Sequence, residues 1–461
     1  MSDSDKGPPP EVLSREGSLD APFRRPIAWR DEDYYDLAKV EAEMERVFDI
    51  CHGCRRCFNL CDSFPRLFDL VDEGPTGEVD GVPKADYAKV AEACTLCDMC
   101  FLTKCPYVPP HPFDLDFPHL ILRYRAARRR AGEKEFVREQ LGKTDRNGKL
   151  AKPVAGLANW ATARENTPLR KLMEAIAGID AEAELPRYHS RTAGDRLKAA
   201  PVPPNPAGPA FGQRKVALYA TCFVDYNQPD TAVAAARVLA LQGVDVRFVY
   251  PECCGMPQLE AGDLSDVAGK AERVAAVFAP LIDEGWDVVA LTASCGLMMK
   301  FEWPLLLTDS APVAALSRAT KDVSEYVVEL ARTFGLVEGL RPVEGGVTIH
   351  HACHARAQNM GAKSAEMLRL IPETKVDLIE RCSGHGGTFG VMKGTHALAR
   401  KVGRPTARQA MQKANGTLCS DCPLACKHIG QMIEAETAAD APAPPRQAHP
   451  IEIFARAYGA L

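Results

Sequence analysis

Short apolar runs alternate with helical patterns from about residue 211 onward. The runs predict strands because they are rich in valine and end at turn residues, and the stretches at 229–243 and 264–279 have helical spacing. The same order returns later, which indicates an internal duplication. The predicted strands cover 216–219, 244–250 and 288–292 in the first copy and 347–349, 376–379 and 417–418 in the second.

Cysteines follow the predicted strands of both copies. Thirty residues separate Cys222 from Cys253 and 28 separate Cys353 from Cys382, so the spacing agrees. In parallel α/β units, ligand-binding residues gather where strands end and helices begin, because helix N-termini there favour anionic groups. An anionic, thiolate-ligated metal cluster fits this position. The strand-end cysteines are Cys222, Cys253, Cys254 and Cys295 in the first copy and Cys353, Cys382, Cys419 and Cys422 in the second.

The N-terminal half has a different pattern. Residues 1–30 are polar and rich in proline and glycine, which predicts a flexible tail. Apolar residues then recur at helical spacing from Leu37 to Phe48, directly before the first group of cysteines. Residues 113–200 mix helical patterns with charge and contain no cysteine, and the run PVPPNPAGPA at 201–210 predicts a stiff linker.

Composition narrows the class of protein. The chain has 461 residues and a net charge of -5, so it has no overall attraction to nucleic acid. Seventeen cysteines without a secretory signal predict a cytoplasmic protein in which closely spaced cysteines hold metal rather than disulfides. No apolar run of about 18 residues is present, so no membrane-spanning helix is expected.

The N-terminal cysteines form two runs with the spacing of two-cluster ferredoxins. In such proteins the first three cysteines of a run bind one 4Fe–4S cluster and the fourth reaches across to the other. A pair of structural zinc sites is the alternative, although CxxC pairs alone would serve zinc and the crossed clusters use all eight cysteines. The predicted sets are Cys51, Cys54, Cys57 and Cys105 for cluster 1, and Cys61, Cys94, Cys97 and Cys100 for cluster 2.

Two further short sequence motifs in the chain resemble motifs of a known family. The words ECCG at 252–255 and RCSG at 381–384, each between a lone cysteine and a later one, resemble the CCG domain family over residues 211–461. This family occurs in heterodisulfide reductases, in iron–sulfur subunits of lactate and glycolate oxidases, and in the C subunit of anaerobic glycerol-3-phosphate dehydrogenase. The double ferredoxin pattern, the word CFVxYN at 222–227 and the word HPI at 449–451 resemble that C subunit in particular.

The resemblance implies that each CCG domain binds an iron–sulfur cluster, which is noncubane in some members. The ligands would be the lone cysteine, the cysteine pair and the downstream cysteine. The first copy has all four of these residues. Buried structural thiols are the alternative interpretation. The implied ligands are Cys222, Cys253, Cys254 and Cys295.

The second copy departs from the pattern because Ser383 replaces the second cysteine of the pair, and a hydroxyl is a poor iron ligand. Cys353, Cys382 and Cys422 remain, and either Cys419 or Cys426 is near enough in sequence to supply a fourth thiolate. A complete cluster, a cluster with one open iron, and no cluster all remain open. Four nearby histidines are candidate ligands or proton donors, although most are expected to be hydrogen-bonded loop residues. They are His350, His351, His354 and His385.

The glycine-rich run 384–390 follows a predicted strand but does not fit a nucleotide site. Phe389 stands where a dinucleotide-binding loop needs Gly or Ala. Any flavin or nicotinamide step is therefore assigned to another polypeptide.

The predicted fold is a multidomain α+β protein with an α-helical two-cluster ferredoxin module, a helical connector and two duplicated α/β CCG domains. The predicted boundaries are 1–30 for the tail, 31–112 for the module, 113–210 for the connector and linker, 211–315 for the first CCG domain, 316–345 for a connecting helix and 346–461 for the second CCG domain.

These patterns predict an iron–sulfur electron-transfer subunit. It would carry two ferredoxin-type clusters and one or two clusters in the CCG domains, and would relay single electrons between a redox partner, such as a flavoprotein dehydrogenase, and a quinone- or ferredoxin-type acceptor. One alternative is an enzyme that reduces a disulfide at a CCG cluster.

A third hypothesis is a peripheral membrane anchor for a dehydrogenase on the inner face of the cell membrane. It rests on an apolar stretch at 120–124 that interleaves with arginines between 123 and 130, as in a basic interfacial helix. A solvated surface helix is the other interpretation of this stretch. Its apolar residues are Leu120, Ile121, Leu122 and Tyr124.

Overall fold

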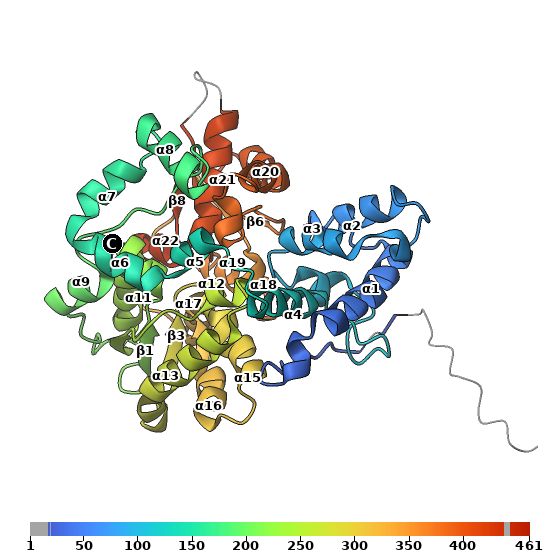
Figure 1. The fold of residues 1–461 in the computed structure, drawn as a ribbon. Helices are drawn as coiled ribbons and strands as arrows, with labels where there is room; N and C mark the ends of the chain where they lie inside the picture. Colours follow the sequence, from blue (N-terminus) through green and yellow to red (C-terminus); the bar gives the residue numbers. More distant parts are fainter. Residues whose placement is uncertain (1–16, 19, 438–442) are drawn as a thin grey trace, which may run out of the picture.

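Two parallel sheets form the centre of the computed structural model, which describes residues 17–18, 20–437 and 443–461 (Figure 1). Within these residues each sheet has four strands, in the orders β2-β1-β3-β4 and β6-β5-β7-β8. The identical order confirms the duplication predicted from the sequence. The strands are β1 (Lys215–Tyr219), β2 (Asp245–Val249), β3 (Asp287–Ala290), β4 (Thr320–Asp322), β5 (Val347–His350), β6 (Val376–Ile379), β7 (Thr417–Ser420) and β8 (Arg446–Ala448).

The central strands of the two sheets occupy equivalent places. Val216 of β1 lies opposite Val246 and Asp287, and Val347 of β5 lies opposite Val376 and Thr417, with every pairing parallel. Central strands of parallel sheets are covered on both faces, which explains why β1 and β5 are runs of buried residues. The carboxyl ends of neighbouring strands therefore meet at one edge of each sheet.

Helices cover both sheets and join the two copies. α11 packs against α22, and one core contains Leu218 of β1 together with Ile349 of β5. The helices predicted at 229–243 and 264–279 are α11 and α13. The helices of the two copies are α10 (Cys222–Asn227), α11 (Pro229–Leu241), α12 (Met256–Glu260), α13 (Leu264–Asp283), α14 (Ala293–Leu297), α15 (Trp303–Leu306), α16 (Ala311–Ala319), α17 (Val323–Phe334), α18 (Cys353–Arg356), α19 (Lys363–Leu368), α20 (His396–Lys413), α21 (Pro423–Glu436) and α22 (Pro450–Ala457).

The segment 316–345, predicted as one connecting helix, is more complex. It contains the end of α16, the strand β4 and the helix α17, whose N-terminus is capped by Asp322. β4 completes the first sheet and α17 packs on α19 of the second copy. This segment therefore belongs to the packed fold of both copies.

The N-terminal helices lie at one side of the sheets, at the blue end of Figure 1. The predicted helix that leads into the first cysteines is α1, which buries Val40, Met44, Val47 and Phe48 as its apolar spacing indicated. Asp36 caps α1 by accepting a hydrogen bond from the backbone N–H of Lys39 at 3.2 Å. These helices are α1 (Leu37–Cys54), α2 (Ser63–Asp72), α3 (Tyr87–Glu92) and α4 (Phe117–Arg130).

The helix α4 is neither the membrane-surface helix nor the solvated surface helix that its sequence allowed. Its apolar residues are buried in a core shared by α1, β3 and Trp303. Its arginines bind neighbouring segments: Arg125 donates hydrogen bonds to the carbonyls of Ala91 and Glu260, and Arg129 pairs with Asp263. The prediction failed because a mixed apolar and basic pattern does not reveal which groups the arginines meet. The buried apolar residues are Leu120, Ile121, Leu122 and Tyr124.

Part of the predicted tail is also packed. Arg24 donates hydrogen bonds to Asp98 at 2.5 Å, to Asp116 at 3.0 Å and to Glu302 at 3.0 Å, and the backbone N–H of Ile27 donates to Leu305 at 2.8 Å. The packed fold thus includes residues 20–30, which the sequence placed in the tail. Residues 1–16 and 19 of that predicted tail lie outside the described residues.

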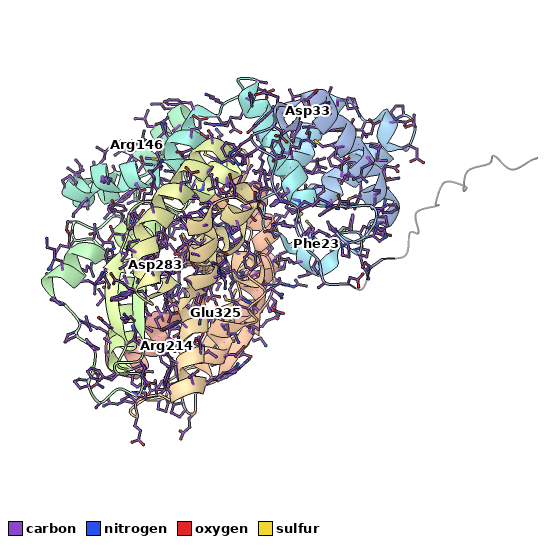
Figure 2. All side chains as sticks on the ribbon, turned by 90° about the horizontal axis from the view of Figure 1, so that it is seen from below. Phe23, Asp33, Arg146, Arg214, Asp283 and Glu325 are labelled. Atoms are coloured by element: carbon purple, nitrogen blue, oxygen red, sulfur yellow. The ribbon has the colours of Figure 1, made fainter. Side chains whose placement is uncertain are left out.

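The later connector helices, α6–α9, lie on the side of the molecule opposite the N-terminal helices (Figure 1), whereas α5 lies nearer the centre and its Glu139 pairs with Arg129 of α4. Figure 2 shows the same separation, with Phe23 and Asp33 on one side and Arg146 on the other. No helix in the described parts of the chain is long and apolar enough to cross a bilayer. The connector helices are α5 (Phe136–Gly142), α6 (Thr144–Ala151), α7 (Ala155–Thr162), α8 (Thr167–Ala177) and α9 (Ala193–Ala199).

The proline-rich stretch 201–210 is fixed against α11 rather than spanning a gap between domains. The backbone N–H of Asn205 donates to Ala240 at 2.8 Å and that of Ala210 donates to Gln242 at 2.9 Å. A Cβ atom at Gly208 would lie 2.3 Å from the backbone nitrogen of Gly243, so this close approach needs glycine.

Candidate functional site

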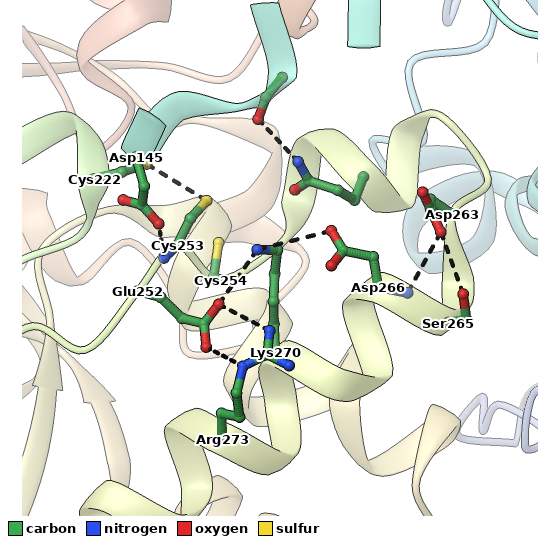
Figure 3. Close-up of polar contacts among 12 residues, drawn as sticks. Asp145, Cys222, Glu252, Cys253, Cys254, Asp263, Ser265, Asp266, Lys270 and Arg273 are labelled. Atoms are coloured by element: carbon green, nitrogen blue, oxygen red, sulfur yellow. Dashed lines mark hydrogen bonds and ion pairs between the residues drawn. The ribbon is translucent and has the colours of Figure 1, made fainter. Parts of the chain in front are cut away.

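Four thiols of the first copy meet at the carboxyl edge of its sheet. Cys222 follows β1, Cys253 and Cys254 follow β2, and Cys295 lies in α14 after β3. The Sγ atoms of Cys222 and Cys253 are 3.6 Å apart (Figure 3). All four thiols are unbridged, and the last three residues are at most 4% exposed. The structure thus brings together the complete set that the sequence singled out.

Two unusual backbone positions aim these thiols. Thr221, directly before Cys222, has a φ of 69°, which is costly for a β-branched residue. Its hydroxyl accepts a hydrogen bond from the N–H of Val224 and lies 3.1 Å from the hydroxyl of Thr292. Gly255 has a φ of 85° and turns the chain into α12 immediately after the cysteine pair. Strained positions of this kind cluster at functional sites.

The cysteine pair is fixed by polar contacts from several elements, of which Figure 3 draws the one from Asp145. Asp145 of α6 accepts a hydrogen bond from the N–H of Cys253 at 2.7 Å. Trp303 donates its indole N–H to the carbonyl of Cys254 at 3.1 Å, and Tyr219 donates its hydroxyl to the carbonyl of Glu252 at 2.6 Å. Asp145 and Trp303 carry no local sequence signal, because each reaches the pair from a distant part of the chain.

The four thiols influence one another electrostatically. Hydrogen bonds from Cys222 and Cys254 lower the pKa of Cys253 well below its ordinary value. The same contacts raise the pKa values of Cys222 and Cys254, and burial adds to both. A buried group of thiolates is stable only beside compensating positive charge, such as metal. The donor set therefore fits a thiolate-ligated metal group.

The second copy gathers its thiols with thiols of the N-terminal part. Cys353, after β5, Cys382, after β6, and Cys97 line one cavity. The interaction with Cys353 lowers the pKa of Cys382 to about 7. The charge of Cys382 also acts on Cys61. Ser383 is buried beside Cys382, and its hydroxyl accepts the N–H of His385 at 3.4 Å. No local pattern in the sequence indicates that the N-terminal cysteines reach this site.

The candidates for a fourth thiolate of the second copy do not reach this group. Cys419 lies inside β7, with no exposed surface, in the core that contains Val347 and Ala448. Cys426 lies in α21 and donates to the carbonyl of Leu418 at 3.6 Å. The assignment of Cys419 from the sequence is therefore wrong in geometry, because the strand continues past this residue and turns its side chain into the core. Cys422 instead lines the same cavity as Cys353.

The eight N-terminal cysteines include groups that act on one another electrostatically. Burial, followed by the charges of Cys105, Cys57 and Cys54, raises the pKa of Cys51. Burial, followed by the charges of Cys97, Cys94, Cys61 and Cys57, raises the pKa of Cys100. Cys57 therefore acts on members of both predicted sets, and the division into two clusters stays a prediction.

A chamber of about 220 Å³ connects the first copy, the second copy and the N-terminal part. Its thiols come from all three. Burial raises the pKa of Glu260, at its side, to about 7. A second cavity of about 210 Å³ shares Glu260 and His385 with it and is also lined by His428. The thiols of the chamber are Cys61, Cys97, Cys222, Cys253, Cys254, Cys295, Cys353, Cys382 and Cys422.

The histidines singled out in the sequence have different roles in this chamber. His354 joins three parts of the molecule, because it lies 2.9 Å from the hydroxyl of Ser294 and 3.4 Å from the carbonyl of Leu96. His350, the last residue of β5, lines the chamber and is hydrogen-bonded to the hydroxyl of Ser420 and the carbonyl of Arg381. His385 lines the chamber and its buried Nε2 atom has no hydrogen-bond partner, whereas His351 lies outside the lining and contacts Glu380.

Comparison with known proteins adds the family context. The model of the cysteine-rich domain called CCG matches residues 216–300 and 347–428. The chain is 28% identical over 359 residues to the C subunit of the anaerobic glycerol-3-phosphate dehydrogenase of Escherichia coli, covering 75% of this chain and 83% of that protein. It is 27% identical over 232 residues to the B subunit of the fumarate reductase (CoM/CoB) of Methanothermobacter marburgensis, covering 49% and 44%. It is 30% identical over 187 residues to lactate utilization protein A of Bacillus licheniformis, covering 38% and 75%.

Proposed function

The chain belongs to the CCG cysteine-rich domain family, and from this premise we propose that it is an iron–sulfur electron-transfer subunit of a multi-subunit oxidoreductase. One observation carries the proposal: Cys97 of the N-terminal part and Cys353 of the second copy line the same chamber as Cys254 and Cys295 of the first copy. Redox groups held by these thiols would lie in one connected series.

The residues would hold the clusters as follows. The two N-terminal sets, each with four thiols, would hold two ferredoxin-type 4Fe–4S clusters. The four thiols of the first copy would hold a third cluster, with Asp145 and Trp303 fixing the backbone of its cysteine pair. When bound, such clusters accept and release single electrons.

The second copy would be an altered site. With Cys419 and Cys426 turned away, its three remaining thiols are Cys353, Cys382 and Cys422, and Ser383 stands where a fourth is needed. We propose that a cluster here would have an open iron facing the chamber. Its neighbours Cys61 and Cys97 connect this place to the N-terminal part.

The relatives include subunits named for a dehydrogenase and for a fumarate reductase. We infer that this chain likewise works with a separate redox protein, most simply a flavoprotein dehydrogenase, and passes electrons on to a quinone- or ferredoxin-type acceptor. The described residues that line the chamber include the thiols assigned to the clusters. The glycine-rich run 384–390 forms part of the same lining, and we assign no nucleotide loop to it.

Iron analysis of the full chain, purified without oxygen, tests the proposal. Three or four clusters predict about 12 to 16 iron atoms per chain, with matching sulfide. Stepwise reduction followed by electron paramagnetic resonance should resolve several S = 1/2 signals. Stoichiometric zinc, or fewer than about eight iron atoms, would overturn the assignment.

A second candidate function is the reduction of a disulfide within the chamber. The specific observation is the group of proton-handling side chains beside the thiols: Glu260, His385 and His428, of which the two histidines have buried Nε2 atoms without partners. Reducing a disulfide to two thiols needs two electrons and two protons. A change in the cluster signal when a disulfide is added to the isolated chain would support this function, and an unchanged signal would contradict it.

The buried carboxyl of Glu260 makes stability depend on pH. Its pKa is about 7 in the fold and near 4.5 in an unfolded chain, so the folded state holds its proton more tightly. The free energy of unfolding should therefore fall as the pH rises from about 4.5 to about 7. In Glu260→Gln this loss should shrink by about 1–3 kcal/mol. Urea unfolding at a series of pH values measures the difference, and Glu165→Gln, at an exposed site, serves as the control.

A further inference from the structure

The connector helix α6 begins beside the thiols of the first copy. Figure 3 shows Asp145, the second residue of this helix, next to Cys222 and Cys253. Asp145 accepts hydrogen bonds from the backbone N–H of Cys253 at 2.7 Å and from the hydroxyl of Tyr250. The helix lies outside the residues that the model of the CCG domain matches. The first site therefore includes residues from outside its own domain.

Close packing fixes the position of α6. A Cβ atom at Gly148 would lie 2.4 Å from the ring of Tyr226 in α10, so the helix approaches α10 as closely as a glycine allows. Directly before α6, the side-chain amide of Gln258 in α12 donates to the carbonyl of Gly142 at 2.9 Å. The helix α10 begins at Cys222, and α12 follows the cysteine pair. The elements that position the cysteines therefore also hold the connector.

Thr144, the first residue of α6, places a buried hydroxyl at the chamber. Its Oγ1 atom has no hydrogen-bond partner among the described residues, and Thr144 lines the chamber together with Cys222 and Cys253. The pKa of Cys253 is well below its ordinary value, chiefly because of Cys222 and Cys254, and the nearby Thr144 lowers it further. A buried hydroxyl without a partner is costly. This position therefore suits an acceptor that is bound at the thiols.

We propose that Thr144 donates a hydrogen bond to a sulfur atom of the cluster held by the first copy and thereby raises the reduction potential of that cluster. The inference rests on the proposed function. A reduced cluster carries one more negative charge than the oxidised cluster, so a donor to its sulfur stabilises the reduced form more. The reduction adds one electron to the cluster, and no bond of Thr144 breaks.

A redox titration of the full chain, followed by electron paramagnetic resonance, tests the inference. The signal of the first cluster is the one that Cys254→Ser removes or alters. Thr144→Val keeps the size of the side chain but removes the hydroxyl. Reduction of the first cluster should then become about tenfold less favourable, which is a fall of about 59 mV for a one-electron couple. Thr144→Ser keeps the hydroxyl and should retain the potential of the unaltered chain.

Solvent exchange gives a second measurement that a purely structural role would not affect. Electron–nuclear double resonance of the first cluster in H2O and in D2O should show one exchangeable-proton coupling fewer in Thr144→Val than in Thr144→Ser. Thr162→Val in α7 is the matched control, because the Thr162 hydroxyl donates to the carbonyl of Ala158 at 2.9 Å and does not line the chamber. In this control both the potential and the couplings should equal those of the unaltered chain.

Three results would overturn the inference. An unchanged potential in Thr144→Val, with the signal of the first cluster present, would show that the hydroxyl binds only water and would leave the proposed function standing. Loss of iron from Thr144→Val but not from Thr144→Ser would assign the hydroxyl to assembly of the cluster instead. If the unaltered chain gave no cluster signal, the proposed function would fail and the inference with it.

Discussion

Replacing Cys254 by serine is expected to remove one ligand of the first cluster, to lower the iron content of the chain by about one to four atoms and to abolish electron transfer. Cys254 is 2% exposed, and Trp303 fixes its backbone carbonyl at 3.1 Å, so the introduced hydroxyl must point into the same site. A hydroxyl is a poor ligand for iron, and the first copy contains no fifth cysteine to replace the lost thiolate. Iron and sulfide analysis after anaerobic purification, with turnover using an artificial donor and acceptor, measures the loss.

Cys419→Ser is the matched control for this substitution. Cys419 is also fully buried, but it lies within β7 and packs in the core around Val347. Its replacement should cost stability without removing iron. Retention of all iron by Cys254→Ser, or the same loss of iron in both variants, would contradict the assignment of the first site.

Arg24→Met is expected to lower the free energy of unfolding by about 3–5 kcal/mol. The guanidinium lies among Asp98, Asp116 and Glu302, and its side chain is 10% exposed. Without it, three carboxylates remain close together in a poorly hydrated place. Removing one partner from a buried ion group is costly for that reason. Urea unfolding followed by far-ultraviolet circular dichroism measures the change.

The neighbouring arginine provides the control. Arg25 pairs with Asp114 at 2.7 Å, but the two side chains are 62% and 39% exposed. Exposed pairs of this kind contribute less than about 1 kcal/mol, so Arg25→Met should unfold almost as the unaltered chain does. Similar effects of the two substitutions would show that residues 20–30 add little to the fold.

Much of the sheet architecture could be predicted because its signal is local. The central strands β1 and β5 are apolar runs bounded by turns, and the structure places both where expected. The edge strands β4 and β8 have the sequences TKD and RQA, which carry no apolar alternation. They pair because a neighbouring strand offers open hydrogen-bonding groups, which no pattern within three residues can reveal.

In the candidate site, too, features with a local sequence signal could be predicted and contacts between distant segments could not. The cysteines at the predicted strand ends were expected to meet because parallel strands end at one edge of a sheet, and the resemblance to CCG domains implied the set of four in the first copy. Neither signal could predict that Asp145 would reach Cys253 from the connector, or that Cys97 would meet Cys353. These contacts depend on how distant segments pack. The side-chain direction of Cys419 could not be predicted either, because it depends on whether the strand ends before or after this residue. In the structure β7 continues to Ser420, so the side chain of Cys419 turns into the core.

The core that α4 shares with the first copy holds the N-terminal cysteines in a fixed position relative to that copy. At Gly262 the loop before α13 touches the backbone of α4, and a Cβ atom there would lie 2.6 Å from the nitrogen of Ala126. Arg24 and His354 join the same two parts by polar contacts. The N-terminal cysteines therefore cannot swing toward a partner as a tethered ferredoxin would. The spacing of the thiol groups is settled when the chain folds, and a partner must dock to a rigid body.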